Sequence, residues 1–434
     1  MSWGANSYGE LGNGATLSTG CICEASPVGV IVLDNIVAIA GGEGHSLALT
    51  SDSVVWAWGA NSSGQLGNGT TTHSNTPVQV NGLTGVVAIS GGGMHSVALK
   101  QDGTIWAWGR NEVGELGNGT LVNSSTPVQV GGLTGMVSVA AGRYHTLAVK
   151  NDGTIWAWGA NTWGQLGNGA VATTGCSCET QPFQIPGLAD VAAVSGGAEH
   201  SLALLGNGTV RAWGENAWGQ LGNGTTITTG CYCIPNPVQV SGLTNITAIS
   251  SGAVHSVAMR SDGTVWAWGR NLEGELGNGS TTTSNIPVQV SGLTNVAAIA
   301  GSNYTSHAVK SDGTVWGWGR NMFGQVGDGS TDDRHAPVQL TGLCSVWTGS
   351  EDLSNEATVT VFPNPTTGMF TMQSGDRSRF VGFDVQNALG QYVHSLPIST
   401  SSLEVDLSSL PSGVYLLNIH VANGSTIFRK LIKE

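Results

Sequence analysis

Five histidines stand at one place in a phrase that recurs along the chain. Each follows a glycine-containing turn and begins a run of small and aliphatic residues: His45, His95, His145, His200 and His255. Histidine serves in proton transfer and in metal ligation. A histidine copied into nearly every repeat is better explained by the architecture than by five equivalent active sites, and Thr305 replaces it in a sixth copy. We therefore predict structural imidazoles that hydrogen-bond neighbouring backbone.

Six of the seven cysteines form Cys-x-Cys pairs in short inserts. The pairs are Cys21/Cys23, Cys176/Cys178 and Cys231/Cys233, with Cys344 left over. Isolated pairs without nearby histidines are weak evidence for a metal site. In an exported protein disulfides within or between inserts are favoured, and the second and third inserts lie in adjacent repeats that could be cross-linked. Metal binding and free thiols are the alternatives.

No other group of residues indicates catalysis. Asp328, Asp332 and Asp333 resemble a calcium-binding loop only loosely, so we expect a solvated acidic loop. The sequence contains no nucleophile elbow, phosphate-binding loop or paired catalytic carboxylates. We predict a protein that is not an enzyme and that needs no cofactor and no metal.

A repeat of 50 or 55 residues positions all of these side chains. Its marker is a Trp-Gly pair, which occurs seven times, and the cysteine inserts account for the longer spacing. The tryptophans of the seven pairs are Trp3, Trp58, Trp108, Trp158, Trp213, Trp268 and Trp318. A fixed period of this size is typical of a repeat architecture.

One unit, residues 86–130, divides into four short apolar runs separated by turns. Asp102-Gly103 lies between the second and third runs and predicts a two-residue type I′ hairpin. Trp106 and Trp108, two residues apart, point to one face of a strand. A buried tryptophan removes ~150–250 Å² from water, more than a lone four-stranded sheet can hide. The sheets must therefore stack in a ring, and the sequence predicts an all-β, seven-bladed β-propeller over residues 1–349.

Both ends of the repeat array are incomplete. The unit of Trp3 lacks its first half, and residues 344–349 align with the start of another unit. We predict that 344–349 supply the inner strand of an incomplete seventh blade. We also expect that the natural protein began with a signal peptide and the missing strand, since no signal peptide is present in this chain.

These residues resemble a known family. The pattern W-G-x-N-x-x-G-Q-L-G-N-G, then P-V-Q-V, then G-G-x-x-H-S-x-A-L, is similar to the regulator of chromosome condensation repeats from about Trp3 to Leu343. The resemblance implies a seven-bladed propeller but no particular function. Its founding member acts on chromatin, whereas this chain has 28 acidic and 15 basic residues and a net charge of −13, so we expect no nucleic-acid partner.

The repeats stop near Ser350, and residues 350–356 read as a linker. Residues 357–434 contain seven short β-prone runs with glycine and proline between them, which predicts a small immunoglobulin-like β-sandwich. Several stretches resemble the C-terminal sorting domain of the type IX secretion system. The matching residues include Pro363, Asn364, Pro365, Gly368, Gly390, Leu410, Gly413, Tyr415 and Lys430. The resemblance implies a Bacteroidota-type protein that the type IX machinery secretes or displays on the outer-membrane surface, with the sorting domain usually removed.

Side chains that differ between repeats gather in two loops of each unit. Alternate connections of a meander emerge on one side, so both loops are predicted to share one face, opposite the Asp-Gly hairpins. The candidate ligand-binding residues are Glu43, Met94, Arg143, Tyr144, Glu199, Tyr304, Arg110, Glu215, Arg270, Arg320, Tyr8, Trp163, Trp218 and Phe323. Arginine and aromatic residues dominate binding hot spots.

The sequence as a whole favours a secreted or surface-displayed binding or adhesion module that recognises an extracellular protein or glycan. We expect a monomer. We also expect no transmembrane segment, because no apolar run approaches 18 residues. One alternative is a secreted hydrolase or lyase, which would need convergent acidic or histidine groups. The distribution of Asp and Glu among the repeats shows no such convergence. Another is an exchange factor for a small GTPase, which conflicts with the export signal.

Overall fold

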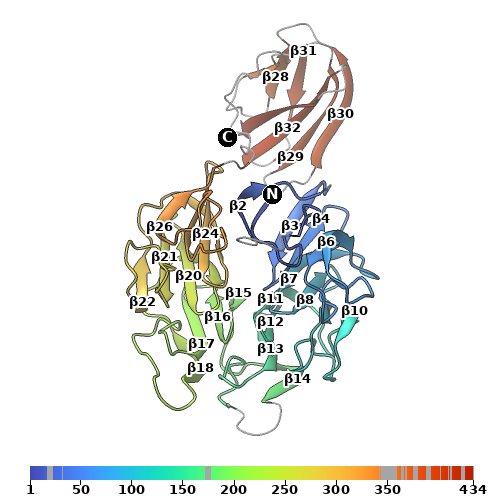
Figure 1. Ribbon diagram of the computed structural model, residues 1–434. Helices are drawn as coiled ribbons and strands as arrows, with labels where there is room; N and C mark the ends of the chain where they lie inside the picture. Colours follow the sequence, from blue (N-terminus) through green and yellow to red (C-terminus); the bar gives the residue numbers. More distant parts are fainter. Residues whose placement is uncertain are drawn as a thin grey trace. The chain divides into compact units, whose positions relative to one another are not determined.

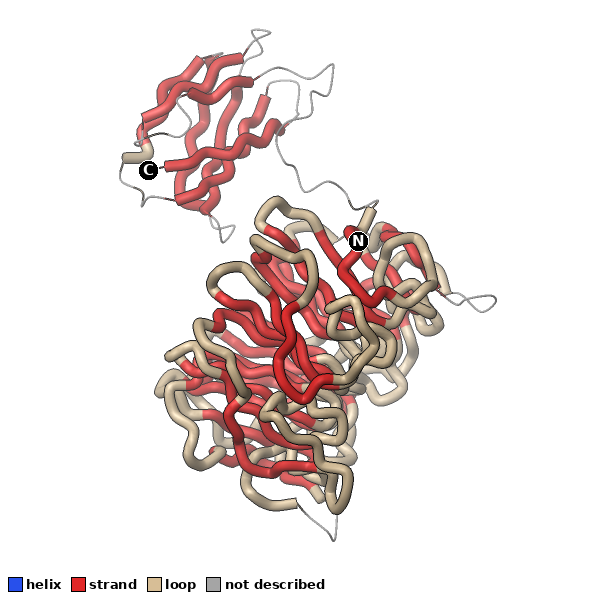
Figure 2. The backbone as a smooth tube through the Cα atoms, turned by 90° about the vertical axis from the view of Figure 1, so that its left-hand side faces the viewer, coloured by secondary structure: helices blue, strands red, loops and turns tan. Residues whose placement is uncertain are grey.

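The computed structural model describes residues 1–16, 23–31, 33–171, 177–341 and 343 in the first part of the chain. In the second part it describes residues 359–362, 366, 369–374, 380–387, 392–400, 402–408, 410, 413–421 and 426–433. The chain divides into two compact units, Met1–Val346 and Trp347–Glu434. Every regular element in the described residues is a β-strand (Figure 2), which confirms the all-β class. Within these ranges, no helix could span a membrane.

Six four-stranded antiparallel sheets, called blades 1 to 6, follow one another along the first unit (Figure 1). Blade 1 consists of β3 (Ile36–Gly41), β4 (His45–Thr50), β5 (Val55–Gly59) and β6 (Ser74–Gln79). Blade 2 consists of β7 (Val86–Gly91), β8 (His95–Lys100), β9 (Ile105–Gly109) and β10 (Ser124–Gln129). Blade 3 consists of β11 (Met136–Ala141), β12 (His145–Lys150), β13 (Ile155–Ala160) and β14 (Cys178–Gln184).

The other three blades repeat this order. Blade 4 consists of β15 (Val191–Gly196), β16 (His200–Leu205), β17 (Val210–Glu215) and β18 (Cys233–Gln239). Blade 5 consists of β19 (Ile246–Ser251), β20 (His255–Arg260), β21 (Val265–Gly269) and β22 (Ser284–Gln289). Blade 6 consists of β23 (Val296–Gly301), β24 (Thr305–Lys310), β25 (Val315–Gly319) and β26 (Arg334–Gln339).

The unit that contains Trp3 forms only a two-stranded sheet, called the partial blade. Its strands are β1 (Ser2–Ala5) and β2 (Cys23–Val28), and it lies between blade 6 and blade 1 (Figure 1). The predicted ring with one incomplete blade is found as six complete blades plus this sheet, because only the second half of the first repeat is present. The inner strand predicted from residues 344–349 lies outside the described residues.

Apolar side chains from two adjacent blades form each complete interface. Between blades 1 and 2, for example, Leu47 and Val55 of blade 1 pack with Val86 and Trp108 of blade 2. Trp108 is fully buried, as are its equivalents in blades 3 to 6. Burying ~150–250 Å² of indole at ~25 cal/mol per Å² contributes on the order of 4–6 kcal/mol gross per tryptophan. The stacking of sheets that the sequence required is therefore present.

One hydrogen bond, repeated seven times, joins each unit to the one before it. The indole Nε1 of Trp108 donates to the Gln65 carbonyl at 2.9 Å, and Trp58 donates in the same way to the Glu10 carbonyl at 2.7 Å. Trp3 donates to the carbonyl of Gln325 at 3.0 Å, across 322 residues of sequence. Because Trp3 belongs to the partial blade and Gln325 to blade 6, this bond closes the ring.

A glycine next to each indole is sterically required. Gly67 has φ +66°, and a Cβ built on it would lie 2.7 Å from Nε1 of Trp108. A side chain there would displace the indole from its carbonyl acceptor and would also strain the backbone. This explains the fixed second glycine of the Gly-Gln-Leu-Gly-Asn-Gly phrase.

The hairpins between second and third strands differ from the prediction. A type I′ turn needs positive φ at both central residues, but only Gly103 adopts it, at 76°, whereas Asp102 does not. Lys100 N donates to the Thr104 carbonyl, closing a longer loop. Asp102 Oδ1 accepts from the backbone N and the hydroxyl of Thr104, at 3.0 and 2.6 Å. Aspartate therefore acts here as a side-chain cap.

The second unit contains two antiparallel sheets. The three-stranded sheet consists of β27 (Val359–Phe362), β28 (Met369–Ser374) and β31 (Ser402–Asp406). The four-stranded sheet consists of β30 (Tyr392–Thr400), β29 (Phe380–Asn387), β32 (Gly413–Val421) and β33 (Thr426–Lys433). Buried side chains come from both, including Phe370 and Phe383. All seven expected runs are strands, while the immunoglobulin-like arrangement stays a prediction.

Candidate binding face of the propeller

Two loops of each blade meet on one side of the ring, called the rim face. The loop between first and second strands contacts the residue that follows the Trp-Gly pair. Arg110 N donates to the Met94 carbonyl at 2.9 Å, and Glu215 N donates to the Glu199 carbonyl at 2.8 Å. The structure thus brings together the two sets of varied residues that the sequence placed on a common side.

A central cavity of about 360 Å³ opens among these loops. All six blades line it with small residues and backbone, at residues 41–43, 90–93, 140–143, 195–198, 250–253 and 300–303. The only large side chains among them are Glu43 and Arg143. Glycine, alanine and serine have small side chains, which leave the centre of the ring open. Most of the charged and aromatic side chains belong to neighbouring positions of the same loops.

Arginine and tyrosine stack at the edge between blades 2 and 3. The guanidinium groups of Arg110 and Arg143 lie 5.0 and 5.1 Å from the ring centre of Tyr144. Arg143 also pairs with Glu43 at 2.7 Å, which links blade 3 to blade 1. Cation–π contacts of this kind contribute ~0.5–1 kcal/mol each at exposed sites, so these side chains are held in place before any ligand binds.

A second stack lies between blades 5 and 6. The guanidinium groups of Arg270 and Arg320 lie 4.8 and 5.5 Å from the ring centre of Tyr304. Arg270 also lies 5.7 Å from the ring of Trp218 and forms ion pairs with Glu273 and Glu275. Arg320 contacts the sulfur of Met322.

Glu199 is the most perturbed acidic group of the rim face. Burial raises its pKa to about 8, the negative charges of Glu215 and Glu43 act in the same direction, and Arg143 opposes them. Gln165 donates its amide N–H to the Glu199 carboxyl group. The pKa of Glu215 is also raised by burial. Acidic groups therefore converge on this edge, contrary to the sequence-based expectation that they would not.

The outer aromatic residues of the rim face contact other rings or are partly exposed. Tyr8 lies 4.9 Å from the ring of His73, and Trp163 lies 6.2 Å from the ring of Tyr232. Tyr8, Trp218 and Phe323 are 48%, 36% and 38% exposed, and Met94 is half-buried. Sequence reasoning missed His73 and Tyr232, because they lie in the variable loop that precedes the fourth strand.

The recurrent histidines form a relay between blades. Nε2 of His45 lies 2.8 Å from the Ser96 hydroxyl, and the same contact joins His95 to Thr146, His145 to Ser201, His200 to Ser256 and His255 to Ser306. Burial lowers their pKa to about 3 or 4, so they are neutral near pH 7. Their role is structural, as expected, but the partner is a hydroxyl of the next blade rather than backbone.

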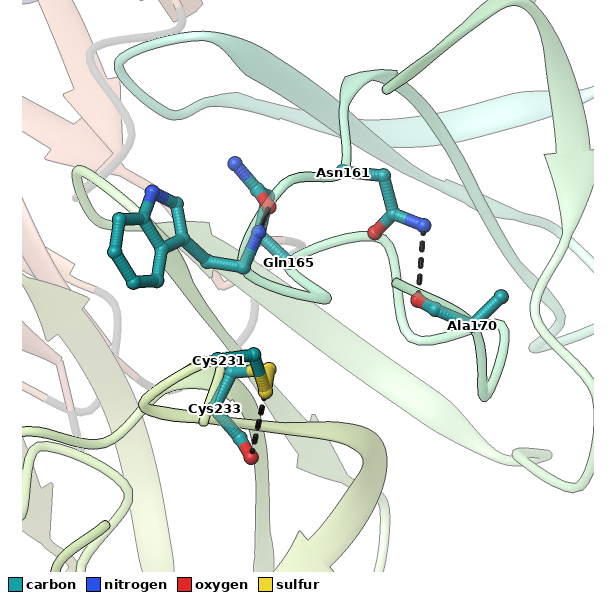
Figure 3. The surroundings of a disulfide bond; sticks show 6 residues. Asn161, Gln165, Ala170, Cys231 and Cys233 are labelled. Atoms are coloured by element: carbon teal, nitrogen blue, oxygen red, sulfur yellow. Dashed lines mark hydrogen bonds between the residues drawn. A yellow bond between two sulfur atoms is a disulfide. The ribbon is translucent and has the colours of Figure 1, made fainter. Parts of the chain in front are cut away.

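The Cys-x-Cys inserts lie in the loop that precedes the fourth strand of a blade. Cys231 and Cys233 form a disulfide (Figure 3), so these two sulfurs do not cross-link adjacent inserts. The intervening Tyr232 has φ 55°, and its carbonyl accepts from Asn216 N at 2.7 Å. In blade 2, which lacks an insert, the Asn123 side chain accepts the equivalent bond from Asn111 N at 2.7 Å. The insert therefore supplies a backbone acceptor in place of a side chain.

The other cysteines are described in part. Cys23 and Cys178 are disulfide-bonded, whereas Cys21, Cys176 and Cys344 lie outside the described residues. Ser177, next to Cys178, has φ 48°, and its carbonyl accepts from Asn161 N at 2.7 Å, as Tyr232 does for Asn216. Asn161 itself is anchored by its Nδ2 bond to the Ala170 carbonyl at 3.1 Å (Figure 3).

Two carboxylates of the acidic loop in blade 6 form hydrogen bonds and an ion pair within the same blade. Asp333 Oδ1 accepts from Asn321 N at 2.7 Å, the role that Asn123 has in blade 2. Asp328 pairs with Arg334 at 2.5 Å and accepts from Ser330. In the ranges that the structure covers, no group of three or more potential ligands could hold a metal ion.

The propeller matches the model of a known protein family. The model of the RCC1-like domain matches residues 1–357, and the chain belongs to this family. A relative in Arabidopsis thaliana, the ultraviolet-B receptor UVR8, is 32% identical over 96 residues, or 22% of this chain and 21% of that protein. Human E3 ubiquitin-protein ligase HERC2 is 36% identical over 109 residues, or 25% of this chain and 2% of that protein. The chain thus matches only a small part of these relatives.

Solved structures share the fold. Prp20p of Saccharomyces cerevisiae has a TM-score of 0.69 at 24% identity, covering 83% of this chain and 87% of that one. Human WBSCR16 has a TM-score of 0.67 at 23% identity, covering 78% and 94%. At such identities the likeness concerns the fold alone.

The C-terminal unit matches a second family model. The secretion system C-terminal sorting domain matches residues 360–434. The protein therefore carries a type IX sorting signal and is an exported protein. Of the sorting-motif residues, Gly413, Tyr415 and Lys430 lie in β32 and β33 and Leu410 lies in the turn before β32. Pro363, Asn364, Pro365, Gly368 and Gly390 lie outside the described residues.

Proposed function

We propose that the propeller is an extracellular recognition module that binds a protein or glycan through its rim face. The observation that carries this proposal is the stacking of arginines on Tyr144 and Tyr304, each of which directly follows a residue that lines the central cavity. Two rim stacks, centred on Tyr144 and Tyr304, hold four arginines in place. Held side chains lose little rotamer entropy on binding, which favours affinity.

The sorting domain supports the place of action. Its type IX signal sends the propeller out of the cell, where it is released or stays attached to the surface. Prp20p binds Gsp1p and histones, but this chain has a net charge of −13 and an export signal. An extracellular partner therefore fits better than a GTPase or chromatin.

The test compares two triple variants of the full chain on arrays of secreted proteins and glycans. The rim variant combines Arg143→Ala, Trp163→Ala and Trp218→Ala. The control combines Lys100→Ala, Lys150→Ala and Lys310→Ala at the hairpins of the opposite face. We expect the rim variant to weaken binding at least about 30-fold, since hot-spot residues cost ~2 kcal/mol or more each, and the control to bind normally. Equal binding by both variants would exclude the rim face.

Glu199 favours a second candidate, a hydrolase or lyase on the propeller scaffold. A carboxyl group that stays protonated near pH 7 beside other acidic groups can act as a general acid. Screening wild type and Glu199→Gln against polysaccharide substrates tests this candidate. Turnover by the wild type that the variant loses would support catalysis, and absence of turnover leaves binding as the function of this edge.

A further inference from the structure

Arginine directly follows the Trp-Gly pair in blades 2, 5 and 6, and in two of these blades its charge is neutralised within the loop. Arg110 pairs with Glu115 at 3.6 Å, and Arg270 pairs with Glu275. In both blades this glutamate lies five residues after the arginine, and its side chain is buried. Each arginine also pairs with a second, more exposed glutamate of the same loop. Blades 2 and 5 therefore supply the counter-charge themselves.

Arg320 of blade 6 has no such counter-charge. The residue five positions later is Gln325, whose Oε1 accepts from Phe323 N at 2.7 Å. The guanidinium of Arg320 lies 5.5 Å from the ring centre of Tyr304, and its Nε lies 3.1 Å from the sulfur of Met322. Among the described residues, no carboxylate oxygen lies within 4.0 Å of its nitrogens. This cation is unpaired in a chain whose net charge is −13.

Glu273 of blade 5 senses the charge of Arg320 but is bound to another arginine. Arg270 Nη2 donates to Glu273 Oε1 at 2.9 Å. The pKa of Glu273 is lowered mainly by its hydrogen bond with Arg270, and the charge of Arg320 makes a smaller contribution in the same direction. Arg320 is therefore left to pair with an acid that comes from outside the fold.

Exposed apolar side chains belong to the same part of the rim. Met322 contacts Arg320, and Arg270 lies between the rings of Trp218 and Tyr304, at 5.7 and 4.8 Å from their centres. Blades 1 to 3 have polar residues, Ser62, Glu112 and Thr162, at the loop position of Met322. We call Arg320 and four partly exposed neighbours the Arg320 patch: Trp218 at 36%, Leu272 at 50%, Met322 at 48% and Phe323 at 38% exposure.

We propose that the Arg320 patch binds an acidic polypeptide segment. A carboxylate of the segment pairs with the Arg320 guanidinium, which can hold both of its oxygens, and adjacent apolar side chains cover Met322 and Phe323. This inference rests on the proposed function and assigns a ligand class to the rim face. Aromatic residues, methionine and arginine are the types enriched in protein–protein interfaces, and methionine adapts to partners of different shape. Leucine and methionine therefore favour a polypeptide over a glycan.

The test selects random peptides displayed on phage against the full chain, then titrates fluorescent synthetic copies of the selected peptides. We expect selection of peptides that combine aspartate or glutamate with neighbouring apolar residues. Arg320→Gln should weaken their binding about 10- to 100-fold, the range for a hydrogen bond to a charged group. Arg320→Lys, which keeps the charge, should lose less. Replacing the acid of the peptide by its amide should cost as much as Arg320→Gln, and both changes together should cost little more than either one.

Gln325→Glu tests the site without removing any residue of the patch. It restores the glutamate of blades 2 and 5, which should neutralise Arg320 from within its own loop as Glu275 does for Arg270. The backbone carbonyl that accepts from Trp3 is unchanged. We expect peptide binding to fall about tenfold or more. The matched control is Lys310→Gln, which removes one positive charge from the same blade at the hairpin of the opposite face and should bind normally.

Several outcomes would overturn the proposal. They are failure to select any peptide, selection of peptides without acidic residues, and equal effects of Arg320→Gln and Lys310→Gln. Binding of polygalacturonate that Arg320→Gln loses, without peptide binding, would assign the patch to an anionic glycan instead. If the rim triple variant loses its array ligands while Arg320→Gln and Gln325→Glu keep them, this inference fails and the proposed function stands. If the rim triple variant also keeps them, the proposed function fails as well.

Discussion

The five complete interfaces and the seam between blade 6 and the partial blade are built from one repeat but solve different problems. In a complete interface the tryptophan is fully buried, and Nε2 of a histidine contacts a hydroxyl group of the next blade. At the seam, Trp3 is only half-buried, Thr305 bonds within its own blade, and His307 supplies a donor that no other blade uses. The comparison teaches that a repeat position changes residue type where its neighbour changes, because each side chain is fixed by what lies across the interface.

The largest expected effect is acid unfolding through the complete interfaces. Burial depresses the pKa of the five relay histidines from 6.5 to about 3 or 4. The unfolded state therefore binds more protons below pH 6.5, so stability is complete above that pH and falls as the pH decreases. Each histidine contributes up to about 1.4 kcal/mol per pH unit, and five together approach the whole stability of a domain, ~5–15 kcal/mol.

Urea unfolding at steps between pH 7.5 and 4.5 measures this loss. Replacing His145 with glutamine should reduce the slope of stability against pH by one proton, although the variant is less stable at pH 7. Stability that stays constant from pH 7 to pH 5 would contradict the buried, neutral assignment.

The second effect compares two equivalent tryptophans. Trp158→Ala removes a fully buried indole from a complete interface and should lower the free energy of unfolding by about 3–5 kcal/mol. Trp3→Ala at the seam should cost less, about 1–2 kcal/mol, because its ring is half-buried. Chemical denaturation followed by circular dichroism distinguishes them. Equal losses would mean that the seam is packed as tightly as the other interfaces.

The smallest effect concerns His307. His307→Leu restores the aliphatic residue type of the other blades but leaves the Gln325 carbonyl with one donor instead of two. We expect a loss of about 0.5–1.5 kcal/mol, the net value of one hydrogen bond. Val257→His, the reverse change in blade 5, is the control and should cost more, because Val257 is fully buried in an apolar cluster. A stabilised His307→Leu variant would show that the second donor is not needed.

Much of the fold was predictable because the fixed repeat length and the spacing of the tryptophans define the strands and require the sheets to stack. Two tryptophans two residues apart on one strand needed a neighbouring sheet to cover them. Trp108 and its equivalents are indeed fully buried between two blades. The hairpin prediction at Asp102-Gly103 was wrong because the aspartate side chain captures Thr104 and lengthens the loop. The binding role of the rim residues stays a prediction, although the structure places them on one face.

Other parts of the rim face could not be read from the sequence. The convergence of Glu43 with Glu199 and Glu215 joins blade 1 to blade 4, and only the curvature of the ring brings those loops together. Likewise, nothing in the spacing of Cys231 and Cys233 indicates that the carbonyl between them replaces the side chain of an asparagine.

By itself the sequence determined the strands, the stacking of sheets and the export signal, because these depend on local turn chemistry, a fixed period and contiguous motifs. Only the tertiary structure decided how the ring closes. Trp3 meets Gln325 across 322 residues, and a contact between distant segments leaves no periodic trace in the chain. The same reason explains why His307 replaces an aliphatic residue, since its partner, the Gln325 carbonyl, also accepts from Trp3 of the partial blade.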